Sequence, residues 1–156
     1  MIIQNKKNRF SSKAGSDTLC INVLNPPADI ALVKKAAQTA LRSEGIIRAD
    51  LTLYFVSDLL IRRLNRKYLS KNSSTDVLAF DLNMQNGPKG RLSGDVVVCI
   101  DTARSVAKEL AIPFKEELCR YVIHGVLHLV GYDDLSVRDR RKMWKRQEYL
   151  LKKCIA

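Results

Sequence analysis

Histidine is scarce in this chain of 156 residues, which contains only two, His124 and His128. Aromatic residues make up just 6% of the chain, and tryptophan occurs once. The four cysteines are scattered, and none forms the C-x-x-C pair of a zinc finger or redox motif. These spacings exclude a dense disulfide framework, so we expect reduced thiols in a cytoplasmic protein.

Long apolar runs are also missing, so no segment reaches the length that a membrane-spanning helix requires. The N-terminal stretch is basic, has no acidic residue before Asp17, and lacks the apolar region of a secretory signal. This favours a disordered or strand-pairing arm over an organelle-targeting segment. We therefore expect one domain over residues 1–156, with no membrane attachment.

Positive charge is in clear excess, with 27 Lys and Arg against 16 Asp and Glu and a net charge of +11. An excess of this size favours a polyanionic partner, either nucleic acid or an acidic membrane surface, over a basic surface that only confers solubility. Two basic groups stand out: an N-terminal arm and a stripe on the last predicted helix with three- and four-residue spacing. We expect the stripe to bind RNA phosphates rather than to be merely solvated; it consists of Arg138, Arg141, Lys142 and Lys145. The arm contains Lys6, Lys7, Arg9 and Lys13.

Strand and helix patterns alternate early in the chain, and helical patterns cluster late. β-rich segments predict strands at 19–24, 51–56, 77–82 and 95–100. Helices are predicted after the capping residues Asp29, Ser57 and Asp101, over 113–130, and from about Ser136 onward. The pattern indicates an α+β fold in which about five helices pack against a small four-stranded sheet.

The stretch HGVLHLVGYDD, from His124 to Asp134, carries the most chemistry. Two histidines four residues apart share one face of a helix. Gly131 suits the end of that helix, and Asp134 follows the turn, from where its carboxylate can swing back toward both imidazoles. Two imidazoles and a carboxylate are a ligand set for catalytic zinc with an open position for water. The alternative is two ordinary histidines on an apolar helix.

This stretch resembles the H-G-x-L-H-L-x-G-Y-D-H signature of the YbeY family, single-strand-specific endoribonucleases and rRNA maturation factors. The segment from Leu64 to Phe80 resembles the family pattern L-N-x-x-Y-R…T-D-V-L-S-F, and Gly94 to Val98 resembles G-D-I-V-I. The resemblance spans about residues 51–151. It implies a mixed sheet with a zincin-like central helix holding one Zn²⁺, and hydrolysis of RNA by metal-bound water. It also implies rRNA, the small ribosomal subunit, a ribosomal protein and an assembly GTPase as partners.

Two positions depart from the family pattern. Asp134 stands where the family has its third histidine, and a carboxylate ligand lowers the charge of a zinc site from +2 to +1. We expect a less acidic bound water and a wider choice of metal, toward manganese or iron. Leu69 stands where the family has an arginine that would clamp phosphate. Lys71 is the best-placed substitute in sequence, so we assign catalytic roles to His124 and Lys71 and metal ligation to His124, His128 and Asp134.

Two other functions fit the residues. The spacing H-x-x-x-H-x-x-G-x-x-D is also similar to that of zinc peptidases, but Gly125 occupies the position of their general-base glutamate, and we expect it to allow close approach to the metal. A ribosome-associated assembly factor that binds RNA with weak or no catalysis is the other alternative, favoured by Leu69 and Asp134.

Overall fold

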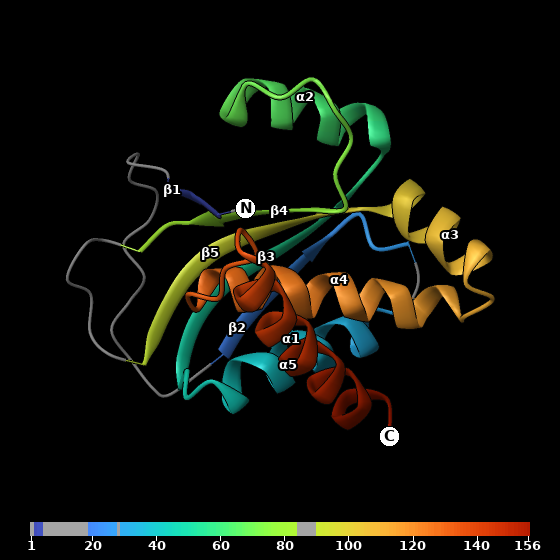
Figure 1. Ribbon diagram of the computed structural model, residues 1–156. Helices are drawn as coiled ribbons and strands as arrows, with labels where there is room; N and C mark the ends of the chain where they lie inside the picture. Colours follow the sequence, from blue (N-terminus) through green and yellow to red (C-terminus); the bar gives the residue numbers. More distant parts are fainter. Residues whose placement is uncertain (1, 5–18, 28, 84–89) are drawn as a thin grey trace.

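Strands and helices alternate in the first half of the chain, and three helices follow one another in the second half (Figure 1). The computed structural model describes residues 2–4, 19–27, 29–83 and 90–156. Its elements in chain order are β1 (Ile2–Gln4), β2 (Leu19–Leu24), α1 (Ile30–Ser43), β3 (Arg48–Val56), α2 (Asp58–Leu69), β4 (Val77–Asp81), β5 (Arg91–Cys99), α3 (Ile100–Glu109), α4 (Phe114–Leu129) and α5 (Val137–Ile155).

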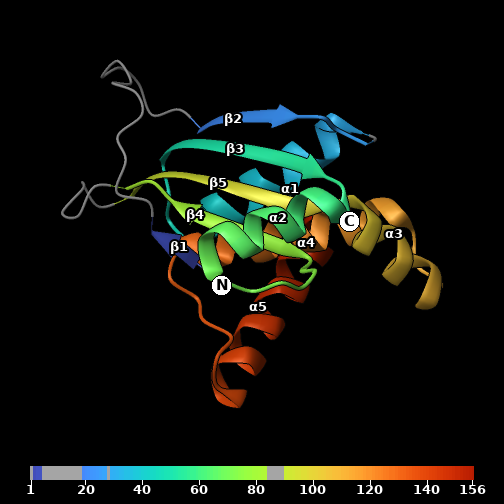
Figure 2. The same cartoon turned by 90° about the horizontal axis from the view of Figure 1, so that it is seen from above.

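The described strands form one mixed sheet in the order β1-β4-β5-β3-β2 (Figure 2). β4 runs antiparallel to β5, and the other neighbouring pairs are parallel. The four predicted strands are all present, and the α+β class and five helices are confirmed. β1 is an additional edge strand, which agrees with the expectation of a pairing N-terminal arm. The basic residues Lys6, Lys7, Arg9 and Lys13 lie outside the described residues.

The two faces of the sheet are covered unequally. Helices α1, α4 and α5 pack on one face, while α2 lies on the other (Figure 1). Strand residues alternate between the two clusters: Val96 and Val98 of β5 join the larger one, and Val97 and Cys99 join the smaller one under α2. This alternation follows from the two-residue period of a strand. The last four residues of β5, Val96 to Cys99, are therefore buried on both faces of the sheet.

Side-chain caps fix where several helices begin. Asp29 accepts a hydrogen bond from Leu32 N at 3.1 Å, and Ser136 accepts one from Asp139 N at 3.0 Å. Such caps satisfy backbone donors that the first turn of a helix leaves unpaired. The prediction for Asp101 was wrong, because α3 begins at Ile100 and the Asp101 carboxylate accepts from the backbone N–H of Asp58 at 2.8 Å. It therefore holds the start of α2 against α3.

The central helix α4 packs directly on Val96 and Val77 of the sheet at Gly125. A Cβ at this position would stand 2.4 Å from Val96 Cγ1 and 3.1 Å from Val77 Cγ1. No side chain fits there without displacing β4 or β5. Gly125 thus faces the strands, so the close approach that it allows is that of β4 and β5 and not that of a substrate.

Within the described parts of the chain, we find no helix with the length and apolarity needed to cross a bilayer.

Candidate metal centre

The structure brings His124, His128 and Asp134 to one point at the C-terminal end of α4. Both histidines belong to the last two turns of the helix, and Gly131, at φ +105°, allows the chain to turn back so that Asp134 faces them. The two Nε2 atoms are 3.0 Å apart. Asp134 Oδ2 lies 3.8 Å from His124 Nε2 and 3.6 Å from His128 Nε2.

These distances suit a small tetrahedral cation. With ligands at about 2.0–2.2 Å from zinc, neighbouring ligand atoms lie roughly 3.3–3.6 Å apart. The observed separations of 3.0, 3.6 and 3.8 Å bracket that range. Asp134, which replaces the histidine of the resembled signature, is thus within reach as a third ligand, and the three residues form a group that could hold a metal ion.

The hydrogen-bond partners of the two imidazole rings leave the Nε2 atom of each histidine unprotonated. His124 Nδ1 faces Gln147 Oε1 at 2.8 Å, and His128 Nδ1 faces the carbonyl oxygen of Tyr132 at 3.1 Å. Since both partners are acceptors, each ring carries its proton on Nδ1. The Gln147 amide is oriented by its own Nε2, which donates to Glu148 at 3.2 Å. Two Nε2 lone pairs and a carboxylate oxygen therefore converge, and a cation held by these three atoms would offset their repulsion.

Burial keeps His128 in the neutral form that a metal requires. The side chain is 2% exposed, and this burial, reinforced by nearby His124, lowers the pKa of His128 to about 4. Its nitrogen is accordingly free of a second proton at neutral pH, and a metal need not displace one.

A second set of contacts fixes the loop that orients His128. The Tyr132 hydroxyl donates to Glu44 Oε2 at 3.3 Å, and Arg146 Nε donates to Glu44 Oε1 at 2.6 Å. Arg146 also donates to the carbonyl of Ser43 at 3.0 Å. These bonds tie the end of α1 and the middle of α5 to the loop, so three separate elements hold the carbonyl that His128 contacts.

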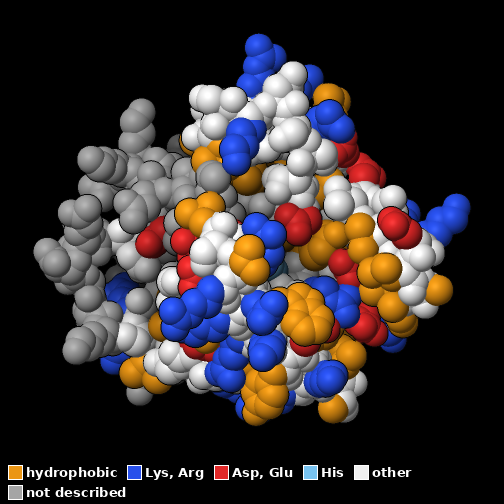
Figure 3. All heavy atoms as spheres, viewed as in Figure 1, with side chains coloured by type: hydrophobic (Ala, Val, Ile, Leu, Met, Phe, Trp, Pro, Cys, Tyr) orange, Lys and Arg blue, Asp and Glu red, His pale blue; other side chains and the backbone are white. Residues whose placement is uncertain are grey.

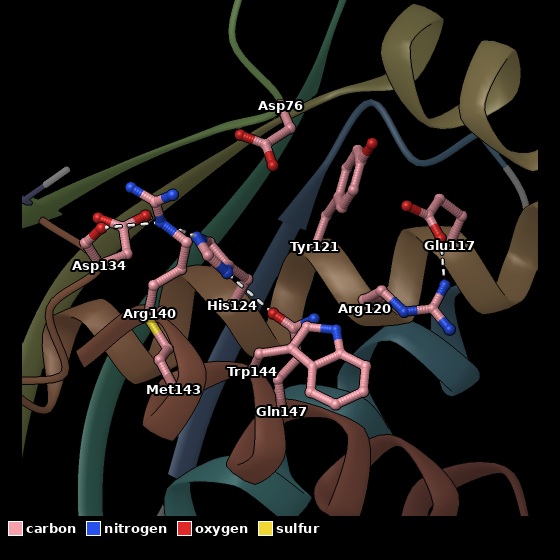
Figure 4. Close-up of a pocket in the computed structure, with 10 residues that line it drawn as sticks. All are labelled: Asp76, Glu117, Arg120, Tyr121, His124, Asp134, Arg140, Met143, Trp144 and Gln147. Carbon is pink, nitrogen blue, oxygen red and sulfur yellow. Dashed lines mark hydrogen bonds and ion pairs between the residues drawn. The ribbon is translucent and has the colours of Figure 1, made fainter. Parts of the chain in front are cut away.

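A cavity of about 370 Å³ opens beside His124 and Asp134 (Figure 4). Its walls come from α4, from α5, from the loop between these two helices that carries Asp134, and from Asp76, which directly precedes β4. The lining residues are Asp76, Glu117, Arg120, Tyr121, His124, Asp134, Arg140, Met143, Trp144 and Gln147. A polar pocket next to a metal centre is a suitable place for a substrate.

One wall of the cavity, formed by Glu117, Arg120 and Tyr121 of α4, is held in place by hydrogen bonds. Arg120 bonds to Glu117, to Glu116 at 3.1 Å and to Glu148 at 2.8 Å, so its charge is already neutralised. Burial, together with the carboxylates of Glu117 and Asp76, raises the pKa of Tyr121 and keeps its hydroxyl protonated. The Tyr121 hydroxyl is therefore a neutral group of this wall that donates its hydrogen bond to the Glu117 carboxylate.

Arg140 is differently placed. Its side chain is exposed, and its Nε donates to the backbone carbonyl of Asp134 at 3.3 Å. Figure 4 shows its guanidinium beside Asp134 and His124. Among the described residues, no carboxylate forms an ion pair with it, so this guanidinium retains its charge at the edge of the metal centre.

Three residues of the segments that resemble the family, among them the predicted catalytic Lys71, do not line this cavity. Leu69 packs with the smaller apolar cluster under α2, on the other face of the sheet. Lys71 is exposed in the following loop and is not among the lining residues. Asp133 is exposed and accepts from Leu135 N at 3.0 Å, a local turn contact, so it is not a partner of either histidine.

The predicted basic stripe lies on the outer side of α5. All four of its members are exposed, and none of them lines the cavity. Lys and Arg side chains gather over this face of the molecule (Figure 3). At 100° per residue, the stripe points away from the side that Arg140, Trp144 and Gln147 present to the cavity. The stripe is thus a flanking surface, and its binding of RNA remains a prediction.

Sequence reasoning missed the cavity wall, although a signal for it was present. Glu117, Tyr121, His124 and His128 follow one another at steps of four, three and four residues, which place them on one stripe of α4. Arg140, Trp144 and Gln147 repeat steps of four and three on α5. Two polar stripes with helical spacing, one of them carrying both histidines, predict a shared polar cavity between two helices.

Comparison with known proteins agrees with this arrangement. The family model described as Endoribonuclease YbeY matches residues 22–155. The chain is 36% identical to the Endoribonuclease YbeY of Aquifex aeolicus over 78% of its own length and 81% of that protein. It is 33% identical to the protein of the same name from Chlorobium luteolum, over 83% and 92% of the two chains.

A solved structure has a similar fold. The solution structure of TM1509 from Thermotoga maritima aligns with a TM-score of 0.60 and 25% sequence identity. The alignment covers 86% of this chain and 88% of that one. Since the family model spans nearly the whole chain and the relatives match over most of their length, the chain belongs to the YbeY endoribonuclease family.

Proposed function

We propose that this protein is a metal-dependent endoribonuclease that hydrolyses single-stranded RNA during rRNA maturation, with one Zn²⁺ held by His124, His128 and Asp134. The observation that carries the proposal is the convergence of three acceptor atoms within 3.0–3.8 Å of one another, beside a polar cavity. Family membership supplies the type of reaction, and the net charge of +11 favours a polyanionic substrate.

The residues around the cavity have distinct roles in this mechanism. When bound, zinc would supply a Lewis acid and lower the pKa of a coordinated water toward neutrality. Arg140 offsets the negative charge of the scissile phosphate. The protonated Tyr121 hydroxyl, hydrogen-bonded to Glu117, adds no negative charge to the cavity. Asp76, whose Oδ1 accepts from Val77 N at 2.9 Å, is held rigidly opposite the histidines and can accept a proton.

The positive group that approaches phosphate is thus Arg140 rather than Lys71. Arg140 lines the cavity, while Lys71 lies in the loop after α2 and outside the lining. Leu69 packs against the opposite face of the sheet, and none of the arginines of α2 lines the cavity. Arg140 approaches the metal centre from α5 instead.

The cellular setting follows from the same proposal. The substrate would be rRNA of the small ribosomal subunit, with quality control of ribosomes, a ribosomal protein and an assembly GTPase as the wider context. A cytoplasmic location agrees with the four free cysteines, of which Cys99, Cys119 and Cys154 are buried.

Metal analysis combined with RNA cleavage tests this proposal. The purified protein should contain about one zinc per chain, and His128→Ala should lose both the metal and the cleavage of a single-stranded RNA. Asp134→Asn should weaken zinc binding, while Asp133→Asn is the matched control, because the neighbouring carboxylate only caps a turn. Cleavage that persists in metal-free His128→Ala contradicts the proposed centre.

A ribosome-associated assembly factor with weak or no catalysis is the second candidate, and Leu69 in place of the family's arginine favours it. RNA binding without cleavage by the zinc-loaded protein would support that function. The peptidase alternative is disfavoured, because the space around Gly125 is filled by Val96 and Val77 and cannot admit a glutamate.

A further inference from the structure

We infer that Trp144 is a stacking platform for an unpaired nucleobase, and that it acts together with Arg140 to select single-stranded RNA at the metal centre. This inference rests on the proposed function and adds a specificity-determining residue to it. Trp144 lies on α5 and is the single tryptophan of the chain.

Trp144 is unusually exposed for a tryptophan that borders a cavity. The side chain is 59% exposed, although it belongs to the wall of the cavity that contains His124 and Asp134. Figure 4 shows the indole projecting from α5 toward the cavity beside Gln147. Among the described residues, no ring or cation stacks on it. A large apolar ring that borders a substrate cavity and is left open to solvent is suited to cover a ligand surface.

Arg140 supplies the second half of the platform. It lies one helical turn before Trp144, and both side chains line the same cavity. Arg140 is bonded to a carbonyl oxygen rather than to a carboxylate, so its charge is available to a phosphate. One nucleotide can therefore place its phosphate against the guanidinium, near the metal ligands, and its base against the indole.

This pairing favours single strands for a physical reason. In a duplex, both faces of each base are already stacked on neighbours and its edge is paired, so the indole cannot cover it without breaking those contacts. A base in a loop or at an end has a free face. Stacking depends on the ring and not on the base identity, so Trp144 gives strand selectivity without strong sequence preference.

Fluorescence provides a direct test, because the emission of tryptophan in this protein comes from Trp144 alone. The wild-type protein is titrated with an unpaired RNA dodecamer, with a duplex of the same composition and with a dodecamer that carries abasic positions. We expect the unpaired dodecamer to quench the emission, and the duplex and abasic RNAs to quench it far less at equal occupancy. Occupancy is followed in parallel by the anisotropy of a dye on the RNA.

Variants separate stacking from a structural effect. Trp144→Ala should weaken binding of the unpaired dodecamer roughly 5- to 100-fold, and Trp144→Phe should recover part of it. Tyr149→Ala is the matched control, because Tyr149 is 56% exposed on the same helix and does not line the cavity. The ratio of KM for the paired substrate to KM for the unpaired substrate should fall toward parity in Trp144→Ala, with its zinc content unchanged.

The outcomes are distinguishable. If the wild type binds and cleaves RNA but the emission is unchanged and Trp144→Ala behaves as wild type, the role of Trp144 is refuted and the proposed function stands. If the zinc-loaded wild type neither binds nor cleaves RNA, the proposed function itself fails. An equal loss of affinity in Trp144→Ala and Tyr149→Ala also overturns the inference.

Discussion

His124 and Gln147 are joined across α4 and α5 by a contact of 2.8 Å between Nδ1 and Oε1, and this contact determines which nitrogen of His124 faces the metal centre. Because the amide oxygen can only accept, the ring proton is held on Nδ1 and the lone pair on Nε2 points inward. A residue outside the three metal-binding candidates thus sets the tautomer of one of them.

Removing this contact should weaken metal binding. We expect Gln147→Ala to lower zinc affinity by about 10- to 100-fold, because the imidazole is free to rotate and to change its tautomer. Competition with a chromophoric chelator measures the change. Gln147→Glu is the control, since its carboxylate also accepts from Nδ1–H and should preserve or raise the affinity; an affinity reduced as much as in Gln147→Ala would contradict this role.

Gly125 should be intolerant of even the smallest side chain. At an open helical position alanine is more favourable than glycine, but here its Cβ would meet Val96 at 2.4 Å. We expect Gly125→Ala to lower the free energy of unfolding by about 1–3 kcal/mol, measured by urea denaturation. Adding Val96→Ala should restore part of that loss, and purely additive effects in the double variant would exclude the steric explanation.

Restoring the arginine of the family signature should not improve the enzyme. Leu69 is half-buried in the apolar cluster under α2, so we expect Leu69→Arg to lose about 1 kcal/mol of stability without a gain in cleavage rate. Melting temperature and single-turnover cleavage measure the two effects. A faster enzyme would show that a guanidinium from this position reaches the substrate after all.

The contribution of Asp58, at the start of α2, to the free energy of unfolding should depend on pH. Hydrogen bonds from Ser74 and from Arg62, the latter at 2.7 Å, lower the pKa of Asp58 below its usual value. A carboxylate with a lowered pKa stabilises the fold above its unfolded-state pKa, and this stabilisation is lost as the pH falls through the folded-state value. Asp58→Asn should therefore be less stable than wild type at pH 7, with a difference that shrinks below about pH 4. Urea unfolding at several pH values measures it, and a constant difference would argue against the ionic origin.

The parts of the fold that depend on local sequence were predictable. Capping side chains marked the starts of α1, α2 and α5, and β-rich runs marked four strands. The short strand β1 gave no signal, because three residues carry no periodicity. The role of Asp101 could not be predicted for a different reason. Its partner, Asp58, is 43 residues away in the sequence and becomes a neighbour only when α2 and α3 pack together.

The residues of the candidate site likewise fall into those that local sequence groups together and those that only packing brings together. The three metal-binding candidates fall within eleven consecutive residues, so helix geometry was enough to group them. Arg140 and Trp144 act from another helix, and their orientation depends on how α5 packs on α4. The sequence pattern drew attention to the basic stripe, which has the stronger charge but faces outward.

The unequal covering of the sheet has a consequence for motion. Helix α2 buries only Ile61 and Asn65 among its own residues, while α4 buries eleven. Local opening of α2 exposes little apolar surface, so its backbone amides should exchange with solvent deuterium through small fluctuations. The amides of α4 can exchange only when the whole core opens. The histidines therefore belong to the slowest-exchanging part of the molecule, and motion of α2 leaves their geometry unchanged.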